Sequence, residues 1–217
     1  MTKIRLRFSK DGPLRYIGHL DFLKVFQQTI RRAKLPVAYS QGFNPHMLLS
    51  FALPLPLGMI SSSDYADLTL EYEMPLDALI SQFNAQAPSG LRILSAWAFD
   101  GPGAAALVTA ADYMLDVQEN VDEIIQVLLS QESIVIPKKT KSGIKDTDIR
   151  PDILDISVEG PAVMMRLSAS SGRFLNPLIV AKLILGRDTD PSSIVRHELY
   201  RHTQDKELVP LHEAPIH

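Results

Sequence analysis

Residues 3–34, KIRLRFSKDGPLRYIGHLDFLKVFQQTIRRAK, decide how the fold begins, because the spacing of their apolar residues changes midway. In residues 3–9, apolar side chains alternate with basic or polar ones, which is the period of a half-buried strand. In residues 19–34, apolar side chains recur at the spacing of one helix face: Leu20, Leu23, Phe26, Ile30 and Ala33. The stretch therefore predicts a strand followed by a helix, joined by a turn at Gly12 and Pro13.

The same order of elements continues outward from this stretch. Up to residue 100, the apolar periods predict a short strand at residues 37–39, then a strand, a strand, a helix and a strand over residues 48–57, 65–72, 76–83 and 91–99. The second half is predicted as strand, helix, strand, strand, helix and strand over residues 113–117, 121–129, 134–136, 163–168, 176–185 and 194–200. A polar loop over residues 138–148 interrupts the strand that opens at residue 134.

Two successive βαββαβ units indicate an α+β fold of two tandem ferredoxin-like modules, each with its own four-stranded antiparallel sheet. The predicted modules cover residues 1–100 and 111–202. A linker rich in Gly and Pro spans residues 101–110, and residues 203–217 are predicted to be a loose tail.

The composition of the 217 residues excludes several kinds of chemistry. The chain contains no cysteine, which excludes disulfides, thiolate catalysis and an iron–sulfur cluster held by this chain. No window approaches the roughly 18 uncharged apolar residues of a membrane span, and the N-terminus lacks the apolar core of a signal peptide. We therefore expect a cytoplasmic protein that binds no membrane.

The net charge of −3 conceals a strong segregation of charge along the chain. Residues 1–50 contain nine Lys or Arg and two Asp or Glu, a balance of +7. Residues 51–136 have a balance of −11, and residues 137–150 return to +3. Two basic patches on an acidic body favour a polyanionic partner such as nucleic acid. The alternative is that the acidic and basic segments face and neutralise each other inside the fold.

Residues 8–58 hold most of the side chains that are typical of a binding surface. Guanidinium groups, aromatic rings and amide edges on loops stack on unpaired bases and hydrogen-bond to them. The candidate binding residues here are Arg15, Tyr16, Arg31, Tyr39, Gln41, Asn44 and His46. The alternative for the aromatic residues Tyr16, Tyr39 and Phe43 is that they fill the edge of the core.

A second group of candidates lies in the second half. Cations on a polar loop suit the phosphate backbone of nucleic acids, and the turn before residue 176 brings one more arginine near a helix N-terminus. These candidates are Lys139, Lys141, Arg150 and Arg173. The alternatives are an ordinary solvated loop and, for Asp148 with Arg150, a structural ion pair.

His19 is the candidate catalytic residue, because a histidine can act as general acid or base near neutral pH. The alternative is a half-buried histidine bonded to a turn carbonyl. Asp21 lies two residues further along a helix and points elsewhere, so the two do not form a catalytic pair by themselves. We expect no metal site, because His19, His46 and one distant carboxylate are a weak ligand set.

Several segments resemble the signature of the bacterial radical SAM-linked proteins, which carry the domain of unknown function numbered 2344. The segments are FSK at residues 8–10, Gly12, LRYI at 14–17, HLD at 19–21, RRA at 31–33, YSQGFNPH at 39–46, LSFALPLPLG at 49–58 and DIRP at 148–151. The resemblance implies a standalone partner of a radical SAM enzyme. In that case S-adenosylmethionine and the iron–sulfur cluster lie in the partner, and this chain binds no cofactor. The resemblance implies no biochemical activity for this chain.

Three functions are compatible with these features. The first is an accessory protein that binds tRNA or rRNA through a basic cleft of the first module and presents it to the radical SAM partner. The second is a metal-independent RNA endonuclease-like enzyme, in which His19 is the acid or base, Tyr16 assists and Arg15 clamps a phosphate. The third is an adaptor that docks the radical SAM protein and contacts no nucleic acid.

Overall fold

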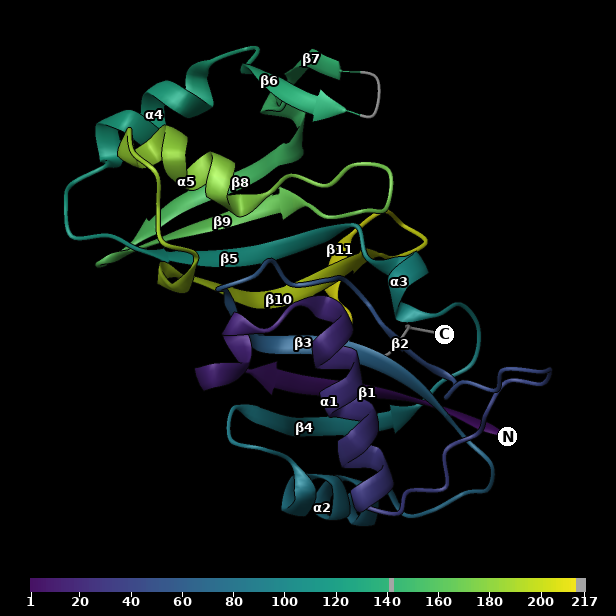
Figure 1. The fold of residues 1–217 in the computed structure, drawn as a ribbon. Helices are drawn as coiled ribbons and strands as arrows, with labels where there is room; N and C mark the ends of the chain where they lie inside the picture. Colours follow the sequence, from purple (N-terminus) through teal and green to yellow (C-terminus); the bar gives the residue numbers. More distant parts are fainter. Residues whose placement is uncertain (141–142, 214–217) are drawn as a thin grey trace.

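The computed structural model describes residues 1–140 and 143–213, except for the side chains of Lys139 and Thr140. Figure 1 shows two halves that lie along one sheet. The first half consists of β1 (Thr2–Lys10), α1 (His19–Arg32), β2 (Leu49–Phe51), β3 (Ile60–Leu70), α2 (Leu76–Gln86) and β4 (Leu91–Ala98). The strand and helix expected within residues 3–34 are therefore both present.

The second half begins after α3 (Ala104–Leu107), a short helix inside the segment expected to be a linker. Its elements are β5 (Ala110–Asp116), α4 (Asp122–Ser130), β6 (Val135–Thr140), β7 (Gly143–Asp148), β8 (Ile153–Glu159), β9 (Ala162–Ser168), α5 (Pro177–Leu185), β10 (Ile194–His202) and β11 (Leu208–Pro210). Within the described ranges, none of the helices combines the length and the hydrophobicity that a membrane crossing requires.

One sheet passes through both halves, in the order β4-β1-β3-β10-β5-β9-β8, with β2 beside β3 and β11 beside β10. The halves join where β3 and β10 pair in parallel, at Ile60 with Val195 and Ser61 with Arg196. The other pairs in this sheet are antiparallel. The α+β class and the mostly antiparallel sheet are thus confirmed, but the expectation of a separate four-stranded sheet in each half is wrong.

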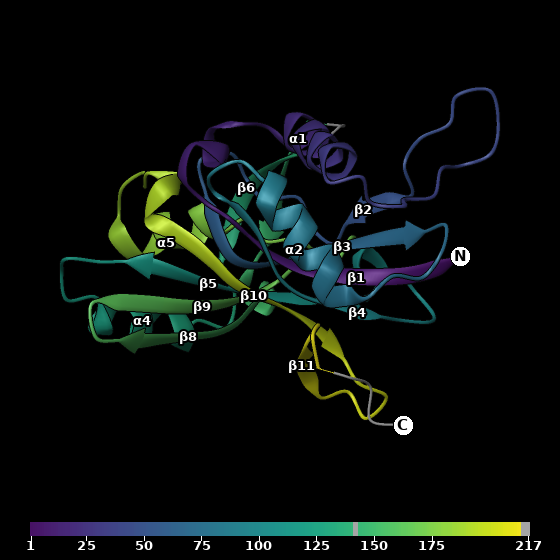
Figure 2. The same cartoon turned by 90° about the horizontal axis from the view of Figure 1, so that it is seen from below.

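In the first half, α1 and α2 cover one face of the sheet, and Figure 2 shows them on the same side of β1 and β4. Alternation along β1 explains this arrangement, because Ile4, Leu6 and Phe8 are buried in the core under these helices. Arg5 and Arg7 then point to the opposite side. We call that side the helix-free face because α1 and α2 do not cover it; among the helices of the described residues, only the short α3 touches it, through the Ala104 amide. This face also carries Tyr65 and Asp67 of β3, Asp112 of β5 and Arg166 of β9.

Three segments differ from the sequence-based expectation for local reasons. The strand expected over residues 48–57 ends at Phe51, before Pro54 and Pro56, which cannot donate to a ladder. Within the segment expected to be a polar loop, residues 138–140 and 143–148 belong to β6 and β7, which pair with each other. The apolar period does not predict β8, because a bulge between Ile153 and Asp155 breaks its alternation.

Residues 203–213 are more ordered than the loose tail expected over residues 203–217, and residues 214–217 lie outside the described residues. β11 pairs with β10, and Leu211 is 2% exposed. The His212 ring reaches the helix-free face, where Nδ1 lies 3.0 Å from the Tyr65 hydroxyl and 3.3 Å from the Glu198 carboxylate.

Candidate nucleic-acid interface

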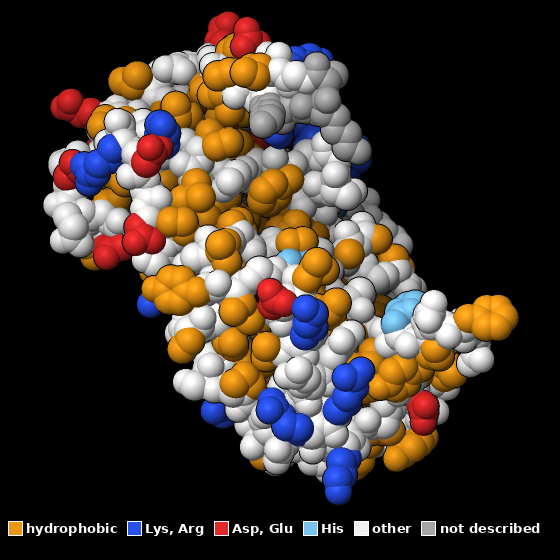
Figure 3. Space-filling model, in the orientation of Figure 1, with side chains coloured by type: hydrophobic (Ala, Val, Ile, Leu, Met, Phe, Trp, Pro, Cys, Tyr) orange, Lys and Arg blue, Asp and Glu red, His pale blue; other side chains and the backbone are white. Residues whose placement is uncertain are grey.

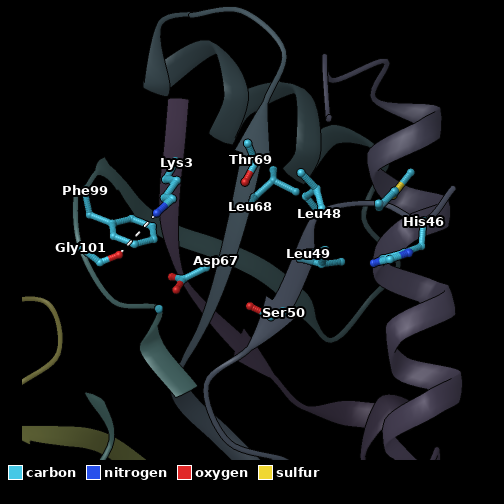
Figure 4. A pocket seen from close by; sticks show the side chains of 12 residues that line it. Lys3, His46, Leu48, Leu49, Ser50, Asp67, Leu68, Thr69, Phe99 and Gly101 are labelled. Atoms are coloured by element: carbon cyan, nitrogen blue, oxygen red, sulfur yellow. Dashed lines mark hydrogen bonds between the residues drawn. The ribbon is translucent and has the colours of Figure 1, made fainter. Parts of the chain in front are cut away.

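A cavity of about 350 Å³ opens on the helix-free face of the first half. Figure 4 shows Lys3 and Phe99 on one side of it and His46 on the other, with Asp67 and Thr69 of β3 between them. The strand register places these side chains together, because Lys3 pairs with Thr69 and alternate residues of a strand share a face. The volume lies in the range of sites for small molecules and single nucleotides.

The charges inside the cavity are unequal. The Asp67 carboxylate accepts hydrogen bonds from Arg5 Nε at 2.7 Å and from the Ala104 amide at 2.6 Å. The Arg5 guanidinium in turn lies 4.3 Å from the Phe99 ring centroid. Lys3 is exposed and makes only a long 3.5 Å hydrogen bond, to the Gly101 carbonyl. The cavity therefore offers one available cation beside an aromatic ring.

The loop of residues 39–46, which we call the finger, projects beside this cavity. Its base is closed by a bridge between Tyr39 and Met47 and by a 2.8 Å hydrogen bond between the Ser40 hydroxyl and His46 Nδ1. Gly42 has φ +121°, a conformation that favours glycine and turns the chain at the tip. Phe43 at the tip is fully exposed, and Figure 2 shows the finger extending away from the body between α1 and β2.

The predicted site residues of the first half divide between two places. Tyr39, Gln41, Asn44 and His46 are exposed on the finger, and His46 also lines the cavity. The core-filling alternative is thus wrong for Tyr39 and Phe43. Arg31 is exposed on the last turn of α1.

Arg15, Tyr16 and His19 lie instead at the other end of α1. The Arg15 carbonyl accepts from the Gly58 amide at 2.8 Å, and its guanidinium lies 5.0 Å from the centroid of the exposed Tyr16 ring. The His19 ring packs against Phe51, with centroids 5.6 Å apart. The candidates therefore do not converge in one basic groove, and in Figure 3 Lys and Arg side chains are spread over the first half around α1.

The basic row of β1 is largely neutralised by acids from later strands. Arg5 is paired with Asp67, and Arg7 contacts Ser63 at 2.7 Å and the Glu198 carboxylate at 3.3 Å. Glu198 also accepts from the Tyr65 hydroxyl at 2.5 Å. Internal pairing, the second interpretation of the charge segregation, thus holds for these arginines.

In the second half, the Arg150 side chain binds backbone carbonyls of the chain itself. Its guanidinium donates to the carbonyls of Leu129, Gln131 and Ile153 at 3.1, 3.2 and 3.1 Å. Asp148 does not pair with that guanidinium. Its carboxylate accepts from the backbone amides of Ile134 and Arg150, and these two bonds lower the pKa of Asp148. The segment DIRP is therefore a structural clamp that leads from the hairpin into β8.

The other second-half candidates fall into two groups. Arg173 is exposed and pairs with Asp152 at 2.7 Å. The side chain of Lys139 and all of Lys141 lie outside the described residues.

We expect Arg150→Ala to lower the free energy of unfolding by about 2–3 kcal/mol, because three carbonyls lose a charged donor. Urea denaturation followed by circular dichroism measures the change. Arg187→Ala is the matched control, since the exposed ion pair of Arg187 with Glu119 should contribute less than about 1 kcal/mol. Equal losses for the two variants would contradict the clamp.

The sequence does not predict a buried cluster where the two halves meet, which we call the junction cluster: Lys10, Asp64 and Arg196. Arg196 is 0% exposed; its Nη2 atom lies 2.5 Å from Asp64 Oδ2 and 2.9 Å from the Leu53 carbonyl. Burial is the largest influence on Asp64 and raises its pKa, while Arg196 opposes that shift. Burial likewise lowers the pKa of Lys10. The cluster is distinguished by the burial of three charged side chains. The spacing of apolar residues in the sequence does not show which charged residues will be buried, so the sequence gives no signal for this cluster.

Comparisons with known proteins add a family and one structural likeness. A family model described as an uncharacterized protein conserved in bacteria (DUF2344) matches residues 3–177. No curated protein matches the chain. Among solved structures, the chain is similar to a chain in the crystal structure of a Cbf5-Nop10-Gar1 complex, with 15% identity and a TM-score of 0.43. The match covers 90% of this chain but only 48% of the other, so this chain spans about half the length of that chain.

In the described residues, no three His, Asp or Glu side chains converge as a metal site would need.

Proposed function

The chain belongs to the DUF2344 family of uncharacterised bacterial proteins, and we propose that it binds single-stranded segments of RNA through the finger and the cavity of its first half. The observation that carries this proposal is the fully exposed Phe43 on the finger, beside a cavity that contains Lys3 and Phe99. An exposed aromatic ring is costly in water and suits stacking on an unpaired base. The ammonium group of Lys3 in the cavity suits a phosphate of the same RNA strand.

The strand order supports the proposal. It is β4-β1-β3-β2 in the first half and β10-β5-β9-β8 in the second, the order of two ferredoxin-like modules whose sheets have merged. RNA-recognition modules with a four-stranded sheet of this kind stack bases on aromatic side chains of the open sheet face. The cavity lies on the corresponding face, which α1 and α2 leave uncovered.

We further propose that this RNA binding serves a radical SAM enzyme, in line with the resemblance of residues 8–58 to radical SAM-linked proteins. S-adenosylmethionine and the iron–sulfur cluster would be held by that partner. A chain without cysteine offers no thiolate for such a cluster.

The test is the salt dependence of RNA binding. With Lys3 and the exposed cations of α1 as phosphate contacts, the affinity for unfractionated tRNA should fall with salt, with a slope of log K against log salt of about −2 to −3. Lys3→Met should make that slope less steep by about 0.7. The control is Lys182→Met in the second half, which breaks a surface ion pair with Asp188. Absence of salt-dependent binding to tRNA and rRNA, with or without the radical SAM partner, would refute the proposal.

A further inference from the structure

A small hollow lies over the junction cluster, on the helix-covered side of the sheet and away from the cavity. Its walls are three aromatic rings, Phe8, Phe22 and Phe51, with Leu53 and Leu55. Lys10 and Asp64 form its polar floor, and the exposed residue His19 is at its mouth. The hollow thus combines two buried charges and aromatic walls with an exposed histidine at its mouth.

Both charged groups of the floor lack a partner that would complete their hydrogen bonding. Asp64 is 4% exposed, and its Oδ2 atom is occupied by Arg196. The Oδ1 atom is buried and has no hydrogen-bond partner among the described residues, while the neighbouring Tyr65 amide lowers the pKa of the carboxyl group. Buried polar atoms are normally paired. An unpaired carboxylate oxygen beside a hollow therefore indicates that a ligand in the hollow would donate a hydrogen bond to it.

Lys10 is in the complementary position. It is 3% exposed and makes one long hydrogen bond, 3.5 Å to the Ile17 carbonyl, while its ammonium group lies 4.6 Å from the Phe22 ring centroid. Asp64 attracts it but forms no ion pair with it within 4.0 Å. The floor therefore presents an acceptor, Asp64 Oδ1, near a donor, Lys10 Nζ.

We propose that this hollow reads the edge of one unpaired uracil or guanine base in the bound RNA. These bases carry a ring N–H beside a carbonyl, so the N–H would donate to Asp64 Oδ1 and the carbonyl would accept from Lys10 Nζ. Cytosine and adenine carry a ring nitrogen acceptor beside an amino group, which places like against like on both contacts. The aromatic walls supply the stacking surface that a base extruded from its strand requires. This inference rests on the proposed RNA binding.

The hollow is closed in this structure, with room of about 10 Å³, enough for one water molecule. A base therefore enters only when the side chains at the mouth turn outward. His19 is exposed, and its ring contacts the Phe51 ring edge-on. The two side chains can rotate apart without breaking any hydrogen bond of the sheet. The strap at Leu53 and Pro54 stays in place, because Arg196 donates to both carbonyls.

The test uses the full chain and two short RNAs of adenosines that differ only in one central nucleotide, uridine or cytidine. The uridine RNA should bind at least about fivefold more tightly, since a good base-edge contact discriminates by about 1–3 kcal/mol. Asp64→Asn and Lys10→Met should each reduce the preference toward one. His19→Trp, a change of an exposed side chain that blocks the mouth, should also abolish the preference.

Each outcome decides a different question. Equal affinities of the wild-type protein for the two RNAs would overturn this inference and leave the proposed RNA binding intact. A preference that survives His19→Trp would place base reading elsewhere and would also overturn it. If neither RNA binds, the proposed function fails, and the hollow is then judged by free uridine against cytidine, followed through the NMR signals of the His19 ring; no uridine-specific shift would refute it. Thermal unfolding of Asp64→Asn shows whether that variant is folded, and His19→Trp keeps the test decisive if it is not.

Discussion

Replacing Arg196 with methionine should lower the free energy of unfolding by about 3–5 kcal/mol, because the change leaves the Asp64 carboxylate buried without its partner. The side chain of Arg196 is 0% exposed and that of Asp64 is 5% exposed, so water cannot replace the lost guanidinium. Two carbonyls of the strap, at Leu53 and Pro54, lose their donors in the same variant. Urea denaturation of the full chain measures the effect.

Two further variants separate loss of the charge pair from loss of packing. Arg196→Met combined with Asp64→Leu should recover a large part of the stability, because an apolar pair of similar volume avoids the cost of an unpaired buried charge. Arg187→Met, which breaks an exposed ion pair with Glu119, is the surface control and should cost less than about 1 kcal/mol. If the double variant is no more stable than Arg196→Met alone, the pairing does not hold the two halves together.

Replacing Phe43 with alanine should weaken RNA binding by about 10- to 100-fold without changing stability. Stacking of a base on an aromatic side chain contributes about 1–3 kcal/mol, and Phe43 makes no contribution to the core because its side chain is fully exposed. Fluorescence anisotropy with a labelled single-stranded RNA measures the affinity.

Tyr72→Ala is the matched control, since Tyr72 is another exposed aromatic residue of the first half, 64% exposed and outside both the finger and the cavity lining. It should leave the affinity within about twofold of the wild-type value. Equal losses in the two variants would mean that exposed aromatic area, and not the finger, governs binding. An unchanged affinity in Phe43→Ala would remove the observation on which the proposed function rests.

The local periods of the chain predict most helices and strands, and they fail where pairing geometry breaks the period. In β1 the alternating apolar residues lie in the core, and in α1 Phe26, Ile30 and Ala33 do so, so the two elements are found where residues 3–34 place them. Leu20, predicted on the same helix face, is instead 70% exposed. In β8 a bulge brings Ile153 and Ile156 to the same face, and the strand is missed. In β6 and β7 the exposed hairpin has few buried residues, so no apolar alternation marks it.

The candidate residues show the same division. Exposure of the finger follows from its own turn residues, Gly42, Asn44 and Pro45, which is why Tyr39 and His46 are found at the surface. Arg150 has equally suitable chemistry for a phosphate, but three carbonyls from two other segments occupy its guanidinium. Whether an arginine is free depends on partners that its neighbours in sequence do not reveal.

The sequence by itself determines most kinds of element, the absence of thiolate chemistry and the turn over residues 41–45, because each depends on composition or on residues a few positions apart. Tertiary structure alone decides which charges are available. Arg7 meets Glu198 and Asp64 meets Arg196 only because β3 and β10 pair in parallel, between segments 135 residues apart in the chain. Contacts across such separations carry no local period, so the neutralised row on β1, the open cavity beside Lys3 and the polar floor under His19 appear only once the sheet is assembled.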